Sequence, residues 1–542
     1  MENYTLGGQI VDVVAGRVYP GIIEVQGGTI ISVTEDPGVM GPLIIPGLID
    51  AHIHIESSML VPSEFARLAV LHGTTAVVAD PHEIANVLGM EGVRFMIDNG
   101  AKVPFKFYFG APSCVPATPF ESAGAVLGPA EVDQLLSWPE INFLSEMMNF
   151  PGVLNDDAGV MAKITAAKKR NKPVDGHAPA LMGEQAARYA KAGITTDHEC
   201  FTIEEAIDKI ESGMKILIRE GSAAKNFDEL IGLISDYPDM IMFCSDDKHP
   251  DDLIEGHINL LIKRAVDAGH NFMDVIRACT LNPVRHYNLQ SGLLQAGDQA
   301  DFILVDNVEE FNILETYILG KRVARSGESL IEQVPVEAIN NFNPLMPVAD
   351  DLRVEATGKT LKVIQAYNGQ LVTSAVEVEP TVRDNYVVSD TDRDILKLVV
   401  LNRYRPQKPA IAFIKGFNLK NGAIASTVAH DSHNIIAVGT DDDSIIHSIQ
   451  NVIKNKGGIS LYTIDENNSL SLPIAGLMSS DNGYVIAEKY KKINGDVQKA
   501  GSTLDAPFMT LSFMSLLVIP ELKLGDKGLF DVATFSFTKS LY

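Results

Sequence analysis

The chain has 542 residues, of which 46% are hydrophobic and 21% are charged, and its formal net charge is −26 at pH 7. The length exceeds what one hydrophobic core supports, and the composition excludes a disordered chain. The negative charge repels polyanions, so we expect no nucleic-acid partner and no membrane partner, whereas a small neutral or cationic ligand fits well.

Cysteine usage and the first residues of the chain indicate the compartment. The N-terminal sequence has neither a basic region nor an apolar region of a secretion signal, and no run of about 18 or more apolar residues follows. The cysteines are far apart and form no CxxC pair, which is typical of reduced thiols. We therefore expect a soluble cytoplasmic protein. The four cysteines are Cys114, Cys200, Cys244 and Cys279.

Two segments with short β-branched runs separated by glycines predict β-strands. Residues 5–45 show this pattern first, and residues 292–327 repeat it. Such runs are typical of hairpins. We predict that residues 1–46 and 291–332 pair into one small composite β-domain built from both flanks of the region between them.

Between these flanks, residues 47–290 alternate strand-like and helical runs. This alternation favours an α/β fold with a (β/α)8 barrel, whose active site lies at the carboxyl ends of the strands. A doubly wound open sheet is the alternative, but no GxGxxG turn supports it. After an apolar run that ends at His52-Ile53-His54, the predicted strands are 74–80, 104–110, 141–146, 173–177, 193–198 and 240–246, and the predicted helices include 62–71, 183–192 and 252–268.

The remaining residues predict a third unit. Residues 333–355 contain several prolines and are predicted to be a linker. Residues 356–542 mix strand and helix patterns and predict a C-terminal α+β domain. Within it, Asp441-Asp442-Asp443 precedes a helical run at 444–455 and is predicted to cap that helix.

Two histidines one residue apart end the first apolar run of the barrel region. On a β-strand, alternate side chains point to the same side, so His52 and His54 would converge on one point. This geometry suits a metal ion. A chain with 13 histidines also produces such a pair by chance, so the rest of the sequence has to decide.

Further potential ligands end the later predicted strands. Glu146, His177, His198 and Asp246 occupy such ends, and in a barrel these ends meet at one rim. Neutral imidazoles bind Zn²⁺, Mn²⁺ and Fe²⁺, while carboxylates neutralise paired cations and bridge them. Two such ions hold a hydroxide at neutral pH, and a rim aspartate can accept the proton of that water.

At these positions the chain resembles the amidohydrolase superfamily and, within it, the bacterial and archaeal adenine deaminases. The superfamily carries an HxH on the first barrel strand, single histidines on two later strands and an aspartate on the last. The resemblance runs essentially from end to end. The segments that carry it are 46–58, 80–86, 146–153, 175–179, 197–199, 245–250, 430–434 and 470–478.

The resemblance implies a metal site and a reaction. His52, His54, His177 and His198 would bind two divalent ions, most simply Mn²⁺ with Fe²⁺ or Zn²⁺ as alternatives, and Glu146 would bridge them. Asp246 would be both ligand and proton shuttle. It follows Ser245 as in the superfamily pattern, although the neighbouring Asp247 is an alternative. The implied reaction is deamination of adenine to hypoxanthine and ammonia in purine salvage, and such barrels are often homo-oligomers.

Other polar residues near predicted strand ends have less definite roles. Glu56, His82 and Glu83 are candidates to contact the purine, since a group must protonate or hydrogen-bond a ring nitrogen during attack on the ring. Capping of the next helix, or support of the metal ligands, is an equally good interpretation of His82 and Glu83. His249 and His257 are expected on the solvated surface or behind the ligands. The pair His430 and His433 would bind another metal, close over the barrel mouth, or form a turn.

Two alternatives from other functional classes remain. A cyclic amide hydrolase of the dihydroorotase or hydantoinase kind would keep the fold and the metals. A catalytically dead scaffold would keep the fold only, and it would be free of metal. The H-x-E and P-C-x-x-C signature of the unrelated zinc deaminases is absent, as is the HExxH of zincins.

Overall fold

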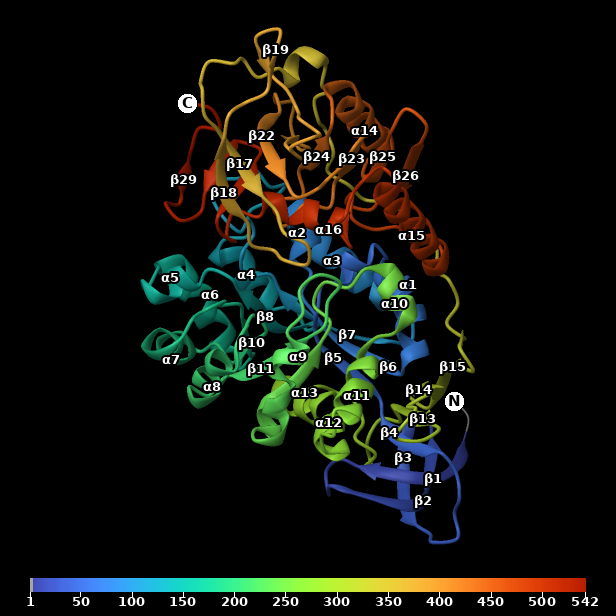
Figure 1. The fold of residues 1–542 in the computed structure, drawn as a ribbon. Coiled ribbons are helices and arrows are strands. Elements are labelled where there is room, and N and C mark those ends of the chain that lie inside the picture. The colour runs from blue at the N-terminus through green and yellow to red at the C-terminus, as the bar shows by residue number, and fades with distance from the viewer. Residues whose placement is uncertain (1–2) are drawn as a thin grey trace.

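The computed structural model describes residues 3–542 and has three parts arranged in a row (Figure 1). An N-terminal β-sheet lies at one end, a barrel of strands and helices in the middle, and a C-terminal unit at the other end. Within the described residues, no helix combines the length and the apolar composition needed to cross a membrane. All four cysteines are buried and free.

Eight parallel strands form the barrel. They are assigned to two sheets, in the orders β5-β6-β7-β8-β9 and β10-β11-β12. The Thr195 amide donates to the Val174 carbonyl at 2.9 Å, which joins the sheets on one side. On the other side Ile53 pairs with Asp246, which closes the ring and confirms the predicted barrel. The strands are β5 (Leu48–Ile53), β6 (Thr74–Ala79), β7 (Lys106–Ala111), β8 (Ile141–Met147), β9 (Val174–Gly176), β10 (Thr196–Asp197), β11 (Lys215–Arg219) and β12 (Ile241–Cys244).

Strand β11 is the one barrel strand that the sequence prediction missed. Its Lys-Ile-Leu-Ile-Arg segment has only three apolar residues between two charged ones. The barrel nevertheless buries Ile216, Leu217 and Ile218. Because a barrel of this kind has eight strands, a search for the missing strand between 198 and 240 would have found it.

Helices surround the barrel and cover its strands. The predicted helix 252–268 is in fact two helices, because the chain turns at Gly256, where a Cβ atom would lie 2.4 Å from Leu260. The helices are α1 (Pro62–Ala69), α2 (His82–Leu88), α3 (Met90–Gly100), α4 (Pro129–Leu136), α5 (Phe150–Leu154), α6 (Ala158–Lys169), α7 (Gly183–Ala192), α8 (Ile203–Glu211), α9 (Phe227–Leu230), α10 (Pro250–Glu255), α11 (Ile258–Asp267), α12 (Phe272–Ala278) and α13 (Leu281–Tyr287).

The N-terminal sheet takes strands from both sides of the barrel in the sequence. Its order is β16-β15-β14-β13-β4-β1-β2-β3, so β4 lies between an early and a late strand. Only Gly47 separates β4 from barrel strand β5. The bounds are β1 (Tyr4–Asp12), β2 (Arg17–Gln26), β3 (Thr29–Glu35), β4 (Leu43–Pro46), β13 (Phe302–Val305), β14 (Ile313–Ile318), β15 (Lys321–Arg325) and β16 (Glu328–Ser329).

The C-terminal unit contains a second eight-stranded sheet, in the order β18-β17-β22-β21-β24-β23-β25-β26. Asp441 caps α14 by accepting from the Ser444 amide at 2.8 Å, which confirms the predicted cap. The bounds are β17 (Leu361–Gln365), β18 (Ser374–Val378), β19 (Val382–Arg383), β20 (Tyr386–Val387), β21 (Leu396–Leu401), β22 (Ala410–Lys415), β23 (Ala423–Ser426), β24 (Ile435–Gly439), β25 (Gly458–Tyr462), β26 (Asn467–Ser471), β27 (Leu522–Gly525), β28 (Gly528–Asp531), β29 (Ser536–Phe537), α14 (Asp442–Lys454), α15 (Gly483–Lys499) and α16 (Pro507–Ser512).

The C-terminal unit packs on the end of the barrel at which the parallel strands terminate. Backbone hydrogen bonds connect the two, since the Ser479 amide donates to the Met59 carbonyl at 2.8 Å and the Val61 amide donates to the Ser479 carbonyl at 3.2 Å. In Figure 1, α16 and α15 lie over α2, α3 and α1. The rim that carries the predicted site is therefore covered by this unit.

Candidate metal centre

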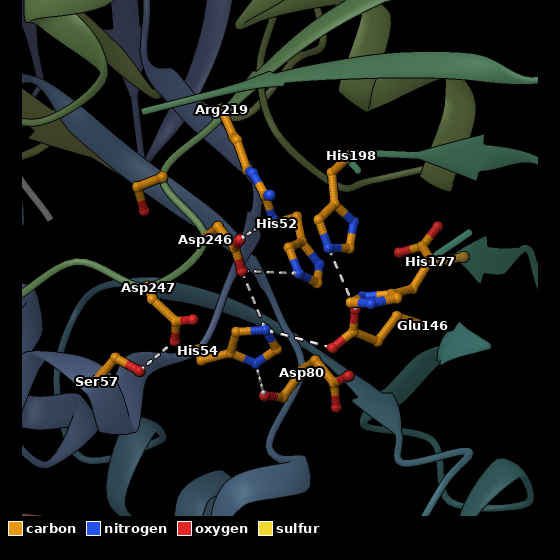
Figure 2. Close-up of polar contacts among 12 residues, drawn as sticks. His52, His54, Ser57, Asp80, Glu146, His177, His198, Arg219, Asp246 and Asp247 are labelled. Atoms are coloured by element: carbon orange, nitrogen blue, oxygen red, sulfur yellow. Dashed lines mark hydrogen bonds and ion pairs between the residues drawn. The ribbon is translucent and has the colours of Figure 1, made fainter. Parts of the chain in front are cut away.

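Six predicted ligand side chains meet at the carboxyl ends of the barrel strands (Figure 2). Asp246 Oδ1 lies 3.6 Å from His52 Nε2 and 3.2 Å from His54 Nε2. Glu146 is on the other side, with Oε1 3.5 Å from His54 Nε2 and Oε2 3.2 Å from His198 Nε2. The Oε2 atom also lies 2.7 Å from His177 Nδ1. Glu146 thus stands between the two histidine pairs.

The donor atoms of this cluster are shielded from water. Five of the six residues are at most 4% exposed, namely His52, His54, Glu146, His198 and Asp246. Neither ring nitrogen of His52 has a hydrogen-bond partner within residues 3–542. A buried imidazole with two unpaired nitrogens is costly unless a further group binds it. Among groups that bind imidazole, a metal ion suits this site because carboxylates and other imidazoles surround it.

The backbone holds Asp246 firmly in the cluster. Its φ angle is +56°, a left-handed conformation that aspartate and asparagine tolerate better than most residues. Its amide donates to the His52 carbonyl at 2.9 Å, and its carbonyl accepts from the His54 amide at 3.2 Å. Burial favours the neutral acid, but Arg219 and the two histidines hold the pKa of Asp246 well below its usual value.

Asp247, the alternative to Asp246, makes different contacts. Its carboxylate accepts a hydrogen bond of 2.5 Å from Ser57 Oγ. Both aspartates line the cavity described below, but Asp246 is the one that groups with His52 and His54. Burial and the neighbouring negative charge of Asp246 raise the pKa of Asp247.

Two residues of the site were missed in the sequence. Arg219, at the end of β11, donates to Asp246 Oδ2 at 2.7 Å and to Glu199 Oε2 at 3.0 Å. Glu199 Oε1 lies 3.4 Å from His198 Nε2. The sequence could have identified Glu199 because it directly follows His198. It could have identified Arg219 because it is the last residue of the strand that was missed.

A layer of hydrogen bonds behind the cluster fixes the ligand rings. The Asp80 carbonyl lies 3.2 Å from His54 Nδ1, so the other ring nitrogen faces the cluster. Asp50 accepts from the Ser245 amide at 3.1 Å and lies 2.8 Å from His257 Nε2. His257 is therefore buried behind the site, which is one of the two positions expected for it.

The three predicted substrate contacts lie at different depths. His82 and Glu83 line the cavity, whereas Glu56 is not among its lining residues. Glu56 is buried and accepts from the Ile84 amide at 3.1 Å. Burial raises the pKa of Glu56 to about 7. His82 Nδ1 lies 3.0 Å from Asp80 Oδ2 and 3.4 Å from Glu146 Oε1, so its ring adjoins the ligand cluster.

The histidines of the C-terminal unit reach into the barrel. His430 Nδ1 contacts one oxygen of Glu83, and His433 Nε2 contacts the other. Burial favours the neutral acid, but these histidines hold the pKa of Glu83 well below its usual value. Of the three interpretations left open for this pair, closure over the barrel mouth matches this geometry.

The cluster opens into a partly open cavity at the barrel rim. Its polar wall comes from the barrel, and its opposite wall is largely apolar and comes from the C-terminal unit. The apolar wall consists of Leu371, Phe513, Leu516 and Ile519.

Two protein families match the chain. The amidohydrolase family matches residues 43–323, and the adenine deaminase C-terminal domain matches residues 370–536. Amidohydrolases depend on metal ions, which agrees with the buried cluster.

Curated relatives match over nearly the whole chain. An adenine deaminase of Salinibacter ruber is 53% identical over 99% of this chain and 98% of its own length. An adenine deaminase of Methanosarcina mazei is 53% identical over 99% of each chain. A solved β-aspartyl dipeptidase structure from Fervidobacterium islandicum aligns with a TM-score of 0.46 and 18% identity over 61% of this chain and 98% of that chain. The resemblance found in the sequence is thus confirmed, and the chain belongs to the adenine deaminases of the amidohydrolase family.

Proposed function

We propose that this protein is a metal-dependent hydrolase that converts adenine and water to hypoxanthine and ammonia, as a step of purine salvage. The reaction class rests on one observation, the meeting of four imidazoles and two carboxylates at the carboxyl ends of the barrel strands, beside a cavity. The substrate rests on relatives named adenine deaminases that are 53% identical over nearly the full length.

The residues present fit two divalent ions. His52, His54 and Asp246 would hold one ion, and His177 with His198 would hold the other. Glu146 stands between the two groups and would bridge them. We propose that the ions are Mn²⁺, with Fe²⁺ or Zn²⁺ as alternatives, because imidazole and carboxylate ligands bind all three. When bound, such ions lower the pKa of a coordinated water, so that it attacks carbon at neutral pH.

Asp246 is placed to move the proton of the attacking water. Its Oδ1 faces the histidines, while its Oδ2 is held by Arg219 at 2.7 Å. In the overall reaction the water oxygen ends on C6 of the purine. One water proton leaves with ammonia and the other ends on a ring nitrogen. Asp246 would carry the first of these protons to the departing amino group.

His82 and Glu83 would orient the purine ring. Both line the cavity beside the ligand cluster, and both are held by other side chains, Asp80 for His82 and the C-terminal histidines for Glu83. Groups held in this way lose little freedom when the substrate binds. We assign Glu56 a supporting role, because it binds the start of helix α2 and does not line the cavity.

Two broader proposals accompany this function. We propose a homo-oligomer from the resemblance to the family, and a cytoplasmic location from the cysteine usage, which is typical of reduced thiols. Light scattering on the purified protein measures the mass, and a monomer would contradict the first of these proposals.

An ammonia-release assay tests the function directly. Adenine, adenosine, guanine and cytosine are each supplied with protein loaded with Mn²⁺ or Fe²⁺, and metal per chain is measured on the same sample. We expect ammonia from adenine. No release from adenine in a metal-loaded sample would overturn the proposal. Hydrolysis of dihydroorotate or a hydantoin would then favour the cyclic amide hydrolase, and a folded protein unable to hold metal would favour the scaffold.

A further inference from the structure

One oxygen of a buried carboxylate at the cavity lacks a hydrogen-bond donor. Asp431 lies in the loop between β23 and β24, is 3% exposed and lines the cavity. Within residues 3–542, its Oδ2 has no hydrogen-bond partner. Its Oδ1 is 3.9 Å from His82 Nε2, which is beyond hydrogen-bond distance. Burying a carboxylate in this state is unfavourable, so a ligand that brings an N–H donor would bind well here.

The loop that carries Asp431 is held on both sides. Ser515 Oγ donates to the His430 carbonyl at 3.3 Å, and the Tyr404 hydroxyl donates to the Ser432 carbonyl at 2.5 Å. The His433 amide donates to the Ala429 carbonyl at 2.7 Å. The backbone on both sides of Asp431 is thus held in place before any ligand arrives, which favours binding.

A third metal ion is the obvious alternative occupant, because His82, Glu83 and Asp431 bring ligand atoms close together. However, both oxygens of Glu83 already contact His430 and His433. Only His82 Nε2 and Asp431 remain, and two protein ligands are fewer than a metal site commonly has. The contacts therefore favour an organic donor.

The position of Asp431 relative to the metal cluster identifies that donor. The His82 ring lies between the two, with Nδ1 3.4 Å from Glu146 Oε1, and with Nε2 3.6 Å from Glu83 Oε1 and 3.9 Å from Asp431 Oδ1. If C6 of adenine and its amino group lie at the cluster, the five-membered ring extends away from it. We propose that Asp431 accepts the ring N–H of this five-membered ring and so selects the free base over its nucleoside. This inference rests on the proposed function.

The walls around Asp431 strengthen the selection. A nucleoside carries a sugar in place of the ring proton, so it leaves the carboxylate without a donor. The apolar residues Leu371, Phe513 and Leu516 also offer no side-chain partners for sugar hydroxyls. A site built around a hydrogen bond rejects an analogue that lacks the donor far more strongly than an apolar pocket rejects an extra group.

The test compares adenine with 9-methyladenine, which has no ring N–H. For the wild type we expect kcat/KM to be at least about 100-fold higher for adenine. Asp431→Asn keeps the size of the side chain but removes its charge, so steric exclusion is unchanged. We expect this preference to fall about 10-fold or more in Asp431→Asn, and further in Asp431→Leu. Metal per chain is expected to stay at the wild-type value in both variants.

Asp394→Asn is the matched control. Asp394 is a buried aspartate of the same unit that accepts from the Gly416 amide at 2.6 Å and the Asn418 amide at 2.7 Å, and it does not line the cavity. This variant is expected to lose stability and to keep the substrate preference. Equal losses for adenine and 9-methyladenine in Asp431→Asn would overturn the inference, as would a loss of bound metal in that variant.

Titration calorimetry separates this inference from the proposed function. Hypoxanthine and 9-methylhypoxanthine are titrated into the metal-loaded wild type and Asp431→Asn. We expect the wild type to prefer hypoxanthine and the variant to lose that preference. Equal affinities in the wild type would overturn the role of Asp431 even if adenine is deaminated. Absence of ammonia release would overturn the proposed function, while the calorimetric preference still decides the role of Asp431.

Discussion

Arg219 Nη1 donates a hydrogen bond of 2.7 Å to Asp246 Oδ2, and the same guanidinium binds Glu199 through Nη2 at 3.0 Å. The buried Arg219 guanidinium thus orients the carboxylate of Asp246, which follows β12 and faces the histidines. It also balances the charge of Glu199 beside His198. The arrangement leaves Asp246 Oδ1 directed at the candidate metal centre. This relationship makes Arg219 a positioning residue that acts through Asp246.

Removing Arg219 is expected to destabilise the protein. Arg219→Met leaves two buried carboxylates without their cation, which costs about 3–5 kcal/mol. Adding Glu199→Gln removes one unpaired charge, so the double variant should regain part of the loss. The free energy of unfolding of chelator-treated proteins in urea measures both effects. A double variant less stable than Arg219→Met would contradict the pairing.

Asp246→Asn is expected to abolish ammonia release and leave the fold intact. The left-handed backbone at Asp246 tolerates asparagine but strains most other residues, so Asp246→Ala should be less stable than Asp246→Asn by about 1 kcal/mol. Thermal unfolding measures the difference, and the ammonia assay measures activity. Wild-type turnover in the asparagine variant would refute the assigned role of the carboxylate.

The contacts between Glu83 and the C-terminal histidines predict an effect on substrate binding. His433→Asn removes the contact to one oxygen of Glu83 without touching a proposed metal ligand. We expect KM for adenine to rise about 10-fold with metal per chain unchanged. Steady-state kinetics and metal analysis on one preparation test this. A fall in bound metal would show instead that His433 supports the metal centre.

The contact between His249 and Tyr490 predicts a pH dependence of stability. His249 Nδ1 lies 2.6 Å from the Tyr490 hydroxyl, and burial lowers the pKa of His249 to about 4. The folded state keeps this histidine neutral, while the unfolded state protonates it below about pH 6.5. The free energy of unfolding should therefore fall as pH drops from about 6.5 to 4, by up to about 3 kcal/mol from this residue.

His249→Gln provides the comparison for this pH effect. The variant lacks the titrating ring, so its free energy of unfolding should depend less on pH over this range. Urea unfolding at several pH values measures both proteins. Parallel pH profiles would contradict the contribution of His249. The contact also shows that this histidine is buried, so the solvated surface, one of the two positions expected for His249, is excluded.

The sequence predicted those parts of the fold and the site that have local signals. His52-Ile53-His54 follows an apolar strand, and His177 and His198 end two others, so strand periodicity alone places them on one rim. Arg219 was missed because its strand was missed, since the apolar run of β11 lies between two charged residues. The contact of His430 with Glu83 spans 347 positions in the chain. Only the packing of the C-terminal unit on the barrel brings those two residues together, and no local pattern encodes that packing.

The most direct test of the central claim is ammonia release from adenine by the Mn²⁺-loaded protein, measured beside Asp246→Asn with metal per chain determined in both. The account predicts release by the wild type and none by the variant, with both proteins folded. A metal-loaded wild type that releases no ammonia from adenine, or a variant that releases it at the wild-type rate, would contradict the account.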